Sequence, residues 1–286
     1  MSPGKEPSLG SRTPRGFCSV VNRNLRLLRS RIIPCLLVQD GGLVKTHKFG
    51  SPKYVGDPIN AVRIFNEKEA DELMVLDIDA SVRGVAPDFK LISLLANECR
   101  MPLTYGGGIN NLEHASRIID MGAEKVAISS AAIESVSILE DIASAVGAQS
   151  VVSVIDVKKR EGLFSSGFNV FTHNGRTKHS ISLLETVKRF EGAGVGEIVI
   201  NNISLDGTMG GYDLELASII REAVQIPVTM LGGAGSYEDI AGLIDHVGLV
   251  GAAAGSVFVF KGRYRAVLIN YPEPHEKELL CRRNKL

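Results

Sequence analysis

Two glycine-rich segments are the parts of this sequence best suited to bind an anion. One is Gly106–Gly108 and the other is Gly232–Gly235, and each follows a short apolar run. Segments without side chains let backbone N–H groups approach an anion, and a helix that begins next adds a favourable dipole. Tight connections between strand and helix would use the same glycines, but the duplication favours two phosphate sites. Small or hydroxyl-bearing residues that could complete these sites are Ser129, Ser130, Gly255 and Ser256.

Carboxylates at the ends of apolar runs are the candidates for proton transfer. Asp156 directly follows the run Val151–Ile155. A carboxylate there could act as a general acid or base, or could form a structural pair with Lys158 or Arg160. Further acids that follow two other runs are Asp77, Asp79 and Asp206. Such acids either accept backbone N–H bonds in loops or contact a substrate, and Asp206 is the best of the three for substrate contact.

Two long segments interrupt the alternation of apolar runs and amphipathic stretches. Asp40–Gly56 contains Lys45, which is either a phosphate-binding lysine on a mobile lid or a solvated lysine. Lys158–Ser180 contains Asn174 followed by Gly175, a pair that predicts a small hairpin. The six histidines are widely separated, so we expect them at the surface and expect no metal site.

Four charged residues stand at the starts of apolar runs. They are Arg31, Glu72, Lys125 and Glu197. In a closed barrel the starts of parallel strands gather at one face, so two cations and two anions could meet there as a ring across the axis. Charges at that face usually serve stability. A ring of alternating sign would also form a polar gate at the floor of the barrel.

The elements that must position these residues follow a regular order. From Arg31 onward, short β-branched runs alternate with amphipathic segments, which is typical of βα units on a parallel sheet. The expected strands are Ile32–Val38, Leu73–Leu76, Leu103–Tyr105, Val126–Ile128, Val151–Ile155, Ile198–Asn201, Val228–Leu231 and Leu249–Ala253. The expected helices include Pro58–Ala70, Phe89–Cys99, Leu112–Met121, Ser135–Val146, Ser182–Gly192, Leu214–Ala223 and Tyr237–Asp245. Eight such units in about 250 residues favour a (β/α)8 TIM barrel over a doubly wound sheet.

An internal repeat strengthens the prediction of a barrel. A shift of 125 residues places Pro102–Thr104 on Pro227–Thr229 and Glu72 on Glu197, and it superposes the two glycine segments. Two half-barrels of four βα units each would give this match, with paired ligand sites on opposite sides of the barrel mouth. The repeat therefore predicts a ligand with two similar ends, each bearing a phosphate.

Composition limits the class of protein. The chain has 286 residues, 44% of them hydrophobic, and 32 basic residues balance 32 acidic ones, so no overall charge favours nucleic acid or a membrane surface. No cysteine pair has CxxC spacing and no apolar run reaches 18 residues, which favours a soluble cytoplasmic protein. Residues 1–28 lack periodicity, so we expect a disordered leader over 1–28, the barrel over 29–270 and a C-terminal tail over 271–286.

At these residues the chain resembles the cyclase subunit of imidazole glycerol phosphate synthase, the HisF-type barrel of histidine biosynthesis. The resemblance extends from about Arg29 to Phe260, and the matching segments are Arg31–Leu36, Gly56–Pro58, Asp71–Leu73, Leu76–Ile78, Gly106–Ile109, Glu197–Ile198, Asp206–Thr208 and Gly232–Gly235. The resemblance implies a (β/α)8 barrel that takes ammonia from a separate glutaminase at its N-terminal face. The ammonia then passes through the barrel to a bisphosphorylated substrate at the C-terminal face, and no cofactor is implied.

The resemblance also implies roles for individual residues. Asp156 matches one of two catalytic aspartates, Lys45 matches a lid lysine, and the four strand-start charges match an ammonia gate. One phosphate site is matched by Gly108, Ser129 and Ser130, and the other by Asp206, Gly207, Gly233, Gly255 and Ser256. Two positions depart from the pattern, because Leu37 replaces the other catalytic aspartate and Ser129 replaces an asparagine.

These departures leave three functions open. The first is an ammonia-channelling subunit with little or no cyclase activity, resembling the HisF-like branch that works with a glutaminase and a sugar amidotransferase to make amidino sugars of surface polysaccharides. The second is an authentic cyclase, which would need another acid such as Asp40 or Asp79 near Leu37. The third is a related sugar-phosphate isomerase barrel, which the four-charge gate disfavours.

Overall fold

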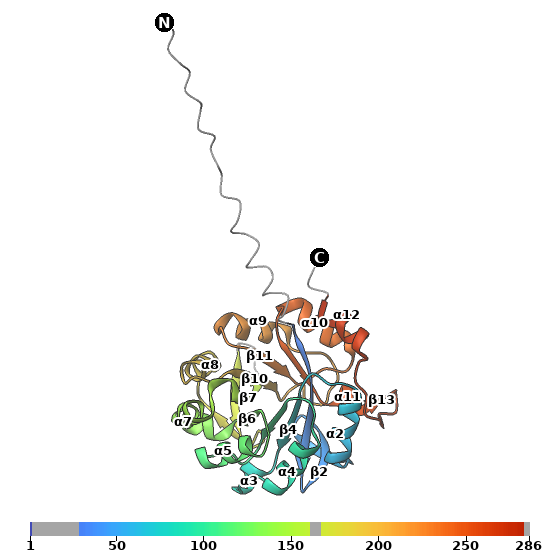
Figure 1. Ribbon diagram of the computed structural model, residues 1–286, viewed down its shortest axis with the longest axis horizontal. Coiled ribbons are helices and arrows are strands. Elements are labelled where there is room, and N and C mark those ends of the chain that lie inside the picture. Colours follow the sequence, from blue (N-terminus) through green and yellow to red (C-terminus); the bar gives the residue numbers. More distant parts are fainter. Residues whose placement is uncertain (2–28, 161–166, 283–286) are drawn as a thin grey trace.

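The computed structural model describes residue 1 and residues 29–160 and 167–282. The strands between Arg31 and Ala254 form one closed barrel (Figure 1). The leader expected over 1–28 lies almost wholly outside the described residues. Eight parallel strands make the barrel wall: β1 (Arg31–Gln39), β4 (Leu73–Asp77), β5 (Leu103–Gly106), β6 (Lys125–Ile128), β7 (Val151–Lys159), β10 (Glu197–Asn202), β11 (Val228–Leu231) and β12 (Gly251–Ala254). β12 pairs with β1 and β10 pairs with β7, so the circle of parallel strands closes. The expected (β/α)8 TIM barrel is confirmed.

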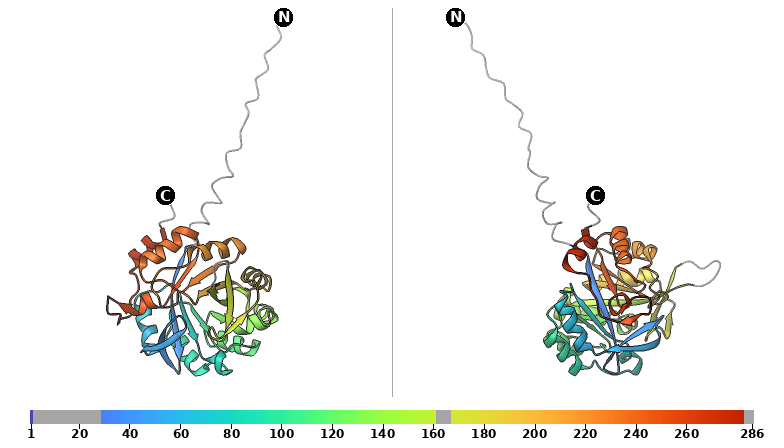
Figure 2. Two further views of the ribbon diagram at one scale, coloured as in Figure 1. Left: turned by 180° about the vertical axis from the view of Figure 1, so that it is seen from behind. Right: turned by 90° about the vertical axis from the view of Figure 1, so that its right-hand side faces the viewer.

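Helices cover the outside of this wall (Figures 1 and 2). The long ones are α2 (Pro58–Glu67), α4 (Phe89–Glu98), α5 (Leu112–Asp120), α7 (Ser137–Val146), α8 (Leu183–Gly192), α9 (Leu214–Ala223) and α10 (Tyr237–Val247). Shorter ones are α3 (Ala80–Arg83), α6 (Ser130–Glu134), the 3-10 turn η1 (Ala148–Ser150) and α11 (Ser256–Val259). Side chains of Asp57, Asp88 and Asp213 cap α2, α4 and α9, which explains why these helices begin where they do.

Two antiparallel hairpins are added to the barrel at equivalent places. β2 (Gly42–His47) and β3 (Gly50–Gly56) extend from β1, while β8 (Phe168–Thr172) and β9 (Thr177–His179) extend from β7. The hairpin predicted at Asn174 and Gly175 is therefore confirmed, whereas the pair β2 and β3 had been expected only as a loop. β3 has mostly exposed residues and no alternation of apolar side chains, so the sequence carried little strand signal there.

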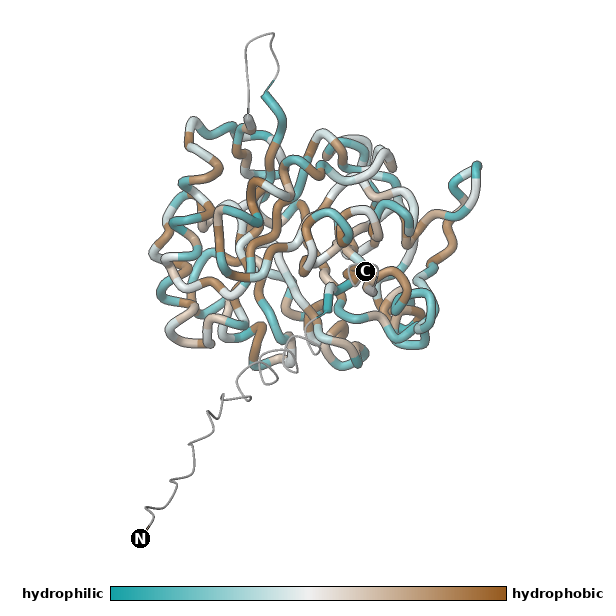
Figure 3. Tube along the Cα trace, turned by 90° about the horizontal axis from the view of Figure 1, so that it is seen from above, coloured by the Kyte–Doolittle hydropathy of each residue, from teal (hydrophilic) through white to brown (hydrophobic). Residues whose placement is uncertain are grey.

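Alternate residues of each strand divide the core into two parts. Side chains that point outward pack under the helices, and those that point inward fill the barrel, where they include Ile33, Met74, Val152, Val199 and Ala253. Figure 3 shows hydrophobic and hydrophilic segments alternating along the chain. The inward residues form an apolar middle layer between the floor, where the strands start, and the mouth, where they end.

The chain after α11 returns along the side of the barrel. It forms the small hairpin β13 (Phe260–Lys261) and β14 (Ala266–Val267) and then α12 (Pro274–Arg282), which lies beside α10 (Figure 1). The residues expected as a C-terminal tail thus contain a helix, whose few apolar side chains gave no clear periodicity. No helix among the described residues is long and apolar enough to span a membrane.

Candidate functional site

A cavity of about 290 Å3 opens at the mouth of the barrel. It is lined by all ten residues that the sequence assigned to catalysis or phosphate binding: Lys45, Gly108, Ser129, Ser130, Asp156, Asp206, Gly207, Gly233, Gly255 and Ser256. These residues come from segments up to 211 positions apart, and the parallel strands bring them together because all the strands end at the same face. Their roles in binding and catalysis stay predictions.

Asp156 is the titratable group at the centre of the mouth. Burial raises the pKa of its carboxyl to about 7, against a hydrogen bond from Asn201 that acts in the opposite direction, and the nearby charge of Asp206 raises it further. Asn201 Nδ2 donates to Asp156 Oδ1 over 2.9 Å, because the two residues are direct neighbours in the β7–β10 register. A carboxyl group with this pKa can both take and give a proton near neutral pH.

Leu37 occupies the equivalent position in the other half of the barrel. It lines the cavity and pairs with Val44 of the added hairpin, as Asp156 pairs with Phe171 of the other hairpin. The acids that might replace a carboxylate at Leu37 lie elsewhere. Asp40 and Asp79 both contact Arg83, and neither lines the cavity.

The remaining acids at the mouth accept hydrogen bonds from neighbouring loop and hairpin residues. Asp77 Oδ1 accepts the N–H groups of Asp79 and Ala80, and burial raises the pKa of Asp77. Asp206 Oδ2 accepts the hydroxyl of Thr46 over 2.7 Å and the N–H of Phe49 over 3.1 Å. These contacts are the loop-capping role that the sequence left open, and Asp206 uses them to hold the β2–β3 hairpin. Its contact with a substrate stays a prediction.

Lys45 lies on β2 and points into the mouth, so the alternative of a solvated lysine is wrong. Its side chain is only 7% exposed, and its Nζ donates to the carbonyl oxygen of Cys35 over 2.8 Å. Burial lowers the pKa of this amine. Gly255 leaves the space that the ammonium group uses, because a Cβ there would lie 2.0 Å from Lys45 Nζ. The lysine and one of the expected phosphate sites are thus in direct contact.

The two glycine turns both have positive φ at their corresponding glycines. Gly107 and Gly232, which correspond under the shift of 125 residues, have φ values of +119° and +99°. A side chain would be strained at either position, and a Cβ on Gly107 would lie 2.5 Å from the carbonyl oxygen of Asp77. The duplicated backbone supports the expectation of two similar anion sites.

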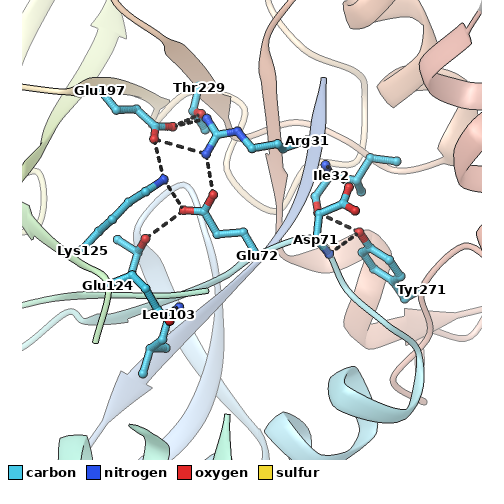
Figure 4. A network of polar contacts seen from close by, with 11 residues as sticks. Arg31, Ile32, Asp71, Glu72, Leu103, Glu124, Lys125, Glu197, Thr229 and Tyr271 are labelled. Atoms are coloured by element: carbon cyan, nitrogen blue, oxygen red, sulfur yellow. Dashed lines mark hydrogen bonds and ion pairs between the residues drawn. The ribbon is translucent and has the colours of Figure 1, made fainter. Parts of the chain in front are cut away.

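At the opposite face, the four strand-start charges meet as one ring (Figure 4). Lys125 Nζ lies 2.8 Å from Glu72 and 2.9 Å from Glu197. Arg31 contacts both glutamates as well, with 2.7 Å between its Nη2 and Glu197 Oε1. Burial alone would raise the pKa of Glu197, but the charges of Arg31 and Lys125 outweigh it and lower that pKa. Each cation therefore bridges both anions, and the ring closes the barrel floor.

The comparison with known proteins fits this arrangement. The sequence model of the family described as "Histidine biosynthesis protein" matches residues 31–265, which include the whole barrel. The chain belongs to this family.

Several relatives within the family carry names of HisF subunits. A Vibrio vulnificus protein, provisionally named imidazole glycerol phosphate synthase subunit hisF3, is 57% identical over 256 residues, which are 90% of this chain and 98% of that protein. A provisionally named subunit hisF2 of Pseudomonas aeruginosa is 50% identical over 253 residues, 88% of this chain and all of that protein. The imidazole glycerol phosphate synthase subunit HisF of Lactococcus lactis is 40% identical over 232 residues, 81% of this chain and 89% of that protein.

This HisF-family barrel also contains polar residues that we did not identify from the sequence. Thr104 donates to Glu72 over 2.9 Å, and Thr229 donates to Glu197, so each glutamate has a threonine partner at the floor. The 125-residue repeat relates Thr104 to Thr229 and Glu72 to Glu197, so the repeat could have identified both threonines in the sequence. Asn201 is the other omission, because its importance depends on its register with Asp156. Within the described residues, no three His, Cys, Asp or Glu side chains gather to hold a metal.

Proposed function

We propose that this chain is an ammonia-conducting subunit of a glutamine amidotransferase complex, with little or no cyclase activity of its own. A glutaminase docked on the barrel floor would hydrolyse glutamine and release ammonia at the ring of Arg31, Glu72, Lys125 and Glu197. The ammonia would pass through the barrel and leave at the mouth. The observation that carries this proposal is the contrast between a complete charged ring at the floor and Leu37 at the mouth.

The interior of the barrel suits a small neutral molecule. Between the ring and the mouth the inward side chains are apolar, and several are small, such as Ala127 and Ala253. An ion that crosses this apolar layer must lose its hydration shell, which costs much free energy, whereas neutral ammonia has no charge to desolvate. Opening the floor requires the partner to separate ion pairs that close it in the isolated chain.

The mouth would hold a phosphorylated small molecule. The duplicated glycine turns offer backbone N–H groups on two sides, and Lys45 supplies a cation beside Gly255. Leu37 offers no proton for closing an imidazole ring, and Asp40 and Asp79 are held by Arg83 outside the cavity. The final acceptor of the ammonia would then belong to a separate enzyme. By the resemblance, we propose a cytoplasmic sugar amidotransferase that makes amidino sugars for surface polysaccharides.

The proposal is tested by reconstituting the complex. The purified chain should form a one-to-one complex with a glutaminase from its own organism in size-exclusion chromatography. Lys125→Glu should weaken this complex because it places an acid between Glu72 and Glu197. A chain that binds none of those glutaminases would contradict the proposal.

The authentic cyclase is the second candidate, and Asp156 favours it. A carboxyl group with a pKa of about 7 could serve as acid and base in turn. The assay that separates the candidates supplies phosphoribulosyl formimino carboxamide ribotide with ammonium salts and follows imidazole glycerol phosphate. Turnover of about 1–1000 per second, the usual range for enzymes, would establish the cyclase and reject the channel-only subunit.

A further inference from the structure

The two expected phosphate sites at the mouth differ in the positive charge beside them. Lys45 lies against Gly255 at one site, and it is the sole lysine or arginine among the described residues that line the cavity. The other site is the one expected at Gly108, Ser129 and Ser130. The same lining contains a single histidine, His173, which is the remaining side chain that can carry a positive charge.

The strand register shows why the second site lacks a lysine. Lys45 follows the residue of β2 that pairs with Leu37, and Thr172 follows the residue of β8 that pairs with Asp156. Thr172 is therefore the structural equivalent of Lys45, and both side chains are buried. Because threonine is neutral, the charge that Lys45 supplies to its own site has no counterpart at this position.

His173, the residue after Thr172, is held against the second site. Its backbone N–H donates to Ser130 Oγ over 3.1 Å, which leaves the hydroxyl hydrogen of Ser130 free to bond a ligand. Its ring Nδ1 lies 3.1 Å from Thr172 Oγ1, which in turn lies 2.8 Å from His179 Nε2. These contacts fix the imidazole at the edge of the cavity beside Ser130.

The other ring nitrogen of His173 faces an acid. Its Nε2 lies 3.7 Å from Oε1 of Glu134, at the end of α6, the helix that begins at Ser130. The side chains of His173 and Glu134 are 34% and 56% exposed, and ion pairs this open to solvent are weak. A phosphate dianion beside Ser130 carries twice the charge of Glu134 and could replace it as the partner of a protonated His173.

We propose that His173 is a binding residue of the phosphate site at Gly108, Ser129 and Ser130, where its protonated imidazole takes the part that Lys45 has at the other site. The proposal rests on the proposed function, because the anion is one phosphate end of the ligand held in the mouth. Histidine changes its charge between about pH 5 and about pH 8. This end of the ligand should therefore bind more tightly at the lower pH, whereas Lys45 stays available to the other end.

Other titratable groups at the mouth must be separated from His173. The carboxyl groups that line the cavity belong to Asp77, Glu134, Asp156 and Asp206, and His179 lies behind Thr172. Asp156 matters most, because burial raises its pKa to about 7 and its ionisation adds a negative charge to the mouth over the same pH range. The experiment therefore uses the full chain with Asp156→Asn as the reference protein.

Sulfate is the probe, because it keeps its double negative charge between about pH 5.5 and about pH 8.5, the range that includes the titration of histidine. Calorimetric titration measures affinity, and crystals grown in sulfate locate the ions. Adding His173→Asn should weaken binding at the site beside Ser130 about tenfold at the lower pH and leave it unchanged at the higher pH, where histidine is neutral. Asparagine suits this position, whose φ is +52°.

Two further variants sharpen the result. Glu134→Gln should tighten sulfate binding at the same site about threefold, because the competing carboxylate is gone. His246→Asn is the matched control, since His246 is exposed and bonds with Ser218 between α9 and α10, and its effect should stay below about twofold at either pH. Circular dichroism should show equal folding of all variants.

The outcomes separate this inference from the proposed function. If His173→Asn weakens binding equally at both pH values, His173 only shapes the hairpin and the inference is wrong. If His173→Asn binds sulfate as the reference protein does at both pH values, or if Glu134→Gln weakens binding, the inference is also wrong, while the phosphate-binding mouth of the proposed function stands. If the reference protein and wild type bind sulfate at neither site, the phosphorylated ligand of the proposed function fails and the inference fails with it.

Discussion

The two ends of this barrel differ in how their polar groups are satisfied. At the floor, Arg31 and Lys125 each bridge Glu72 and Glu197, so all four charges have opposite charges within contact distance. At the mouth, Asp156 has an amide partner but no ion-pair partner among the described residues, and the equivalent position in the other half is Leu37. The charges at the floor are all paired with one another, whereas the mouth is an open cavity whose lining includes the carboxyl group of Asp156. The difference indicates that the two ends have been constrained by different tasks.

Removing one member of the ring should have the largest effect on stability. Glu197→Ala would leave Arg31 and Lys125 sharing a single glutamate, and losing one partner of a buried ion pair costs about 3–5 kcal/mol. The free energy of unfolding in urea measures the loss. Glu98→Ala is the control, because Glu98 pairs with Arg63 at an exposed site, where such pairs contribute at most about 1 kcal/mol. Equal losses of stability in Glu197→Ala and Glu98→Ala would mean that the ring stabilises the fold no more than an exposed ion pair does.

Restoring an acid at the mouth should change catalysis. Leu37→Asp should raise ring closure with ammonium salts by about 10–100-fold, a part of the 100–10,000-fold that an acid–base group can supply. The gain should be partial because Leu37 packs against an apolar cluster, so a carboxylate placed there disturbs that packing and lacks neighbours selected to orient it. Imidazole glycerol phosphate formation measures the gain. Leu37→Asn, whose side chain has the shape of aspartate but cannot transfer a proton, should show no gain. If Leu37→Asp is no faster than wild type, then Leu37 is not the reason for weak cyclase activity.

Filling the space beside Lys45 should weaken anion binding. Gly255→Ala puts a Cβ where Lys45 Nζ lies, so the ammonium group must move, and we expect inorganic phosphate to bind about tenfold more weakly, or about 1.4 kcal/mol. Titration calorimetry with phosphate measures this. Gly242→Ala in α10 is the control, since a Cβ there meets no atom within 4 Å. If both variants bind phosphate as wild type does, the mouth does not use this site.

The smallest effect should be a pH-dependent change in stability at Asp156. The pKa of its carboxyl is raised to about 7 in the folded protein, above the ordinary value of 3.8, so its ionisation disfavours the folded state as pH rises through this range. Asp156→Asn should therefore gain stability relative to wild type between pH 6.5 and pH 9, by about 1 kcal/mol. Thermal unfolding at both pH values measures the gain. Asp245→Asn, at an exposed position, is the control, and its difference in stability from wild type should be the same at both pH values.

The sequence was most informative where chemistry depends on position along a strand. Strand ends and starts gather at fixed faces of a parallel barrel, so Asp156 and the ring residues could be placed without side-chain coordinates. Asn201 could not be identified in this way, because its contact with Asp156 depends on the exact register between β7 and β10. The helix α12 could not be identified from the sequence either, because Lys277 is buried and Leu279 is exposed, which obscures the amphipathic pattern although Leu280 and Cys281 pack against the core.

The added hairpins extend the structural correspondence between the two halves of the barrel. β1 is followed by β2 and β3, and β7 is followed by β8 and β9, so each half contributes six strands in the same order. A half-barrel alone would expose unpaired edges, which two identical copies could cover by pairing with each other. The simplest ancestor is then a symmetric homodimer whose subunit already carried the hairpin before gene duplication and fusion. Separate change of the two halves after such a fusion would account for Leu37 at the position equivalent to Asp156.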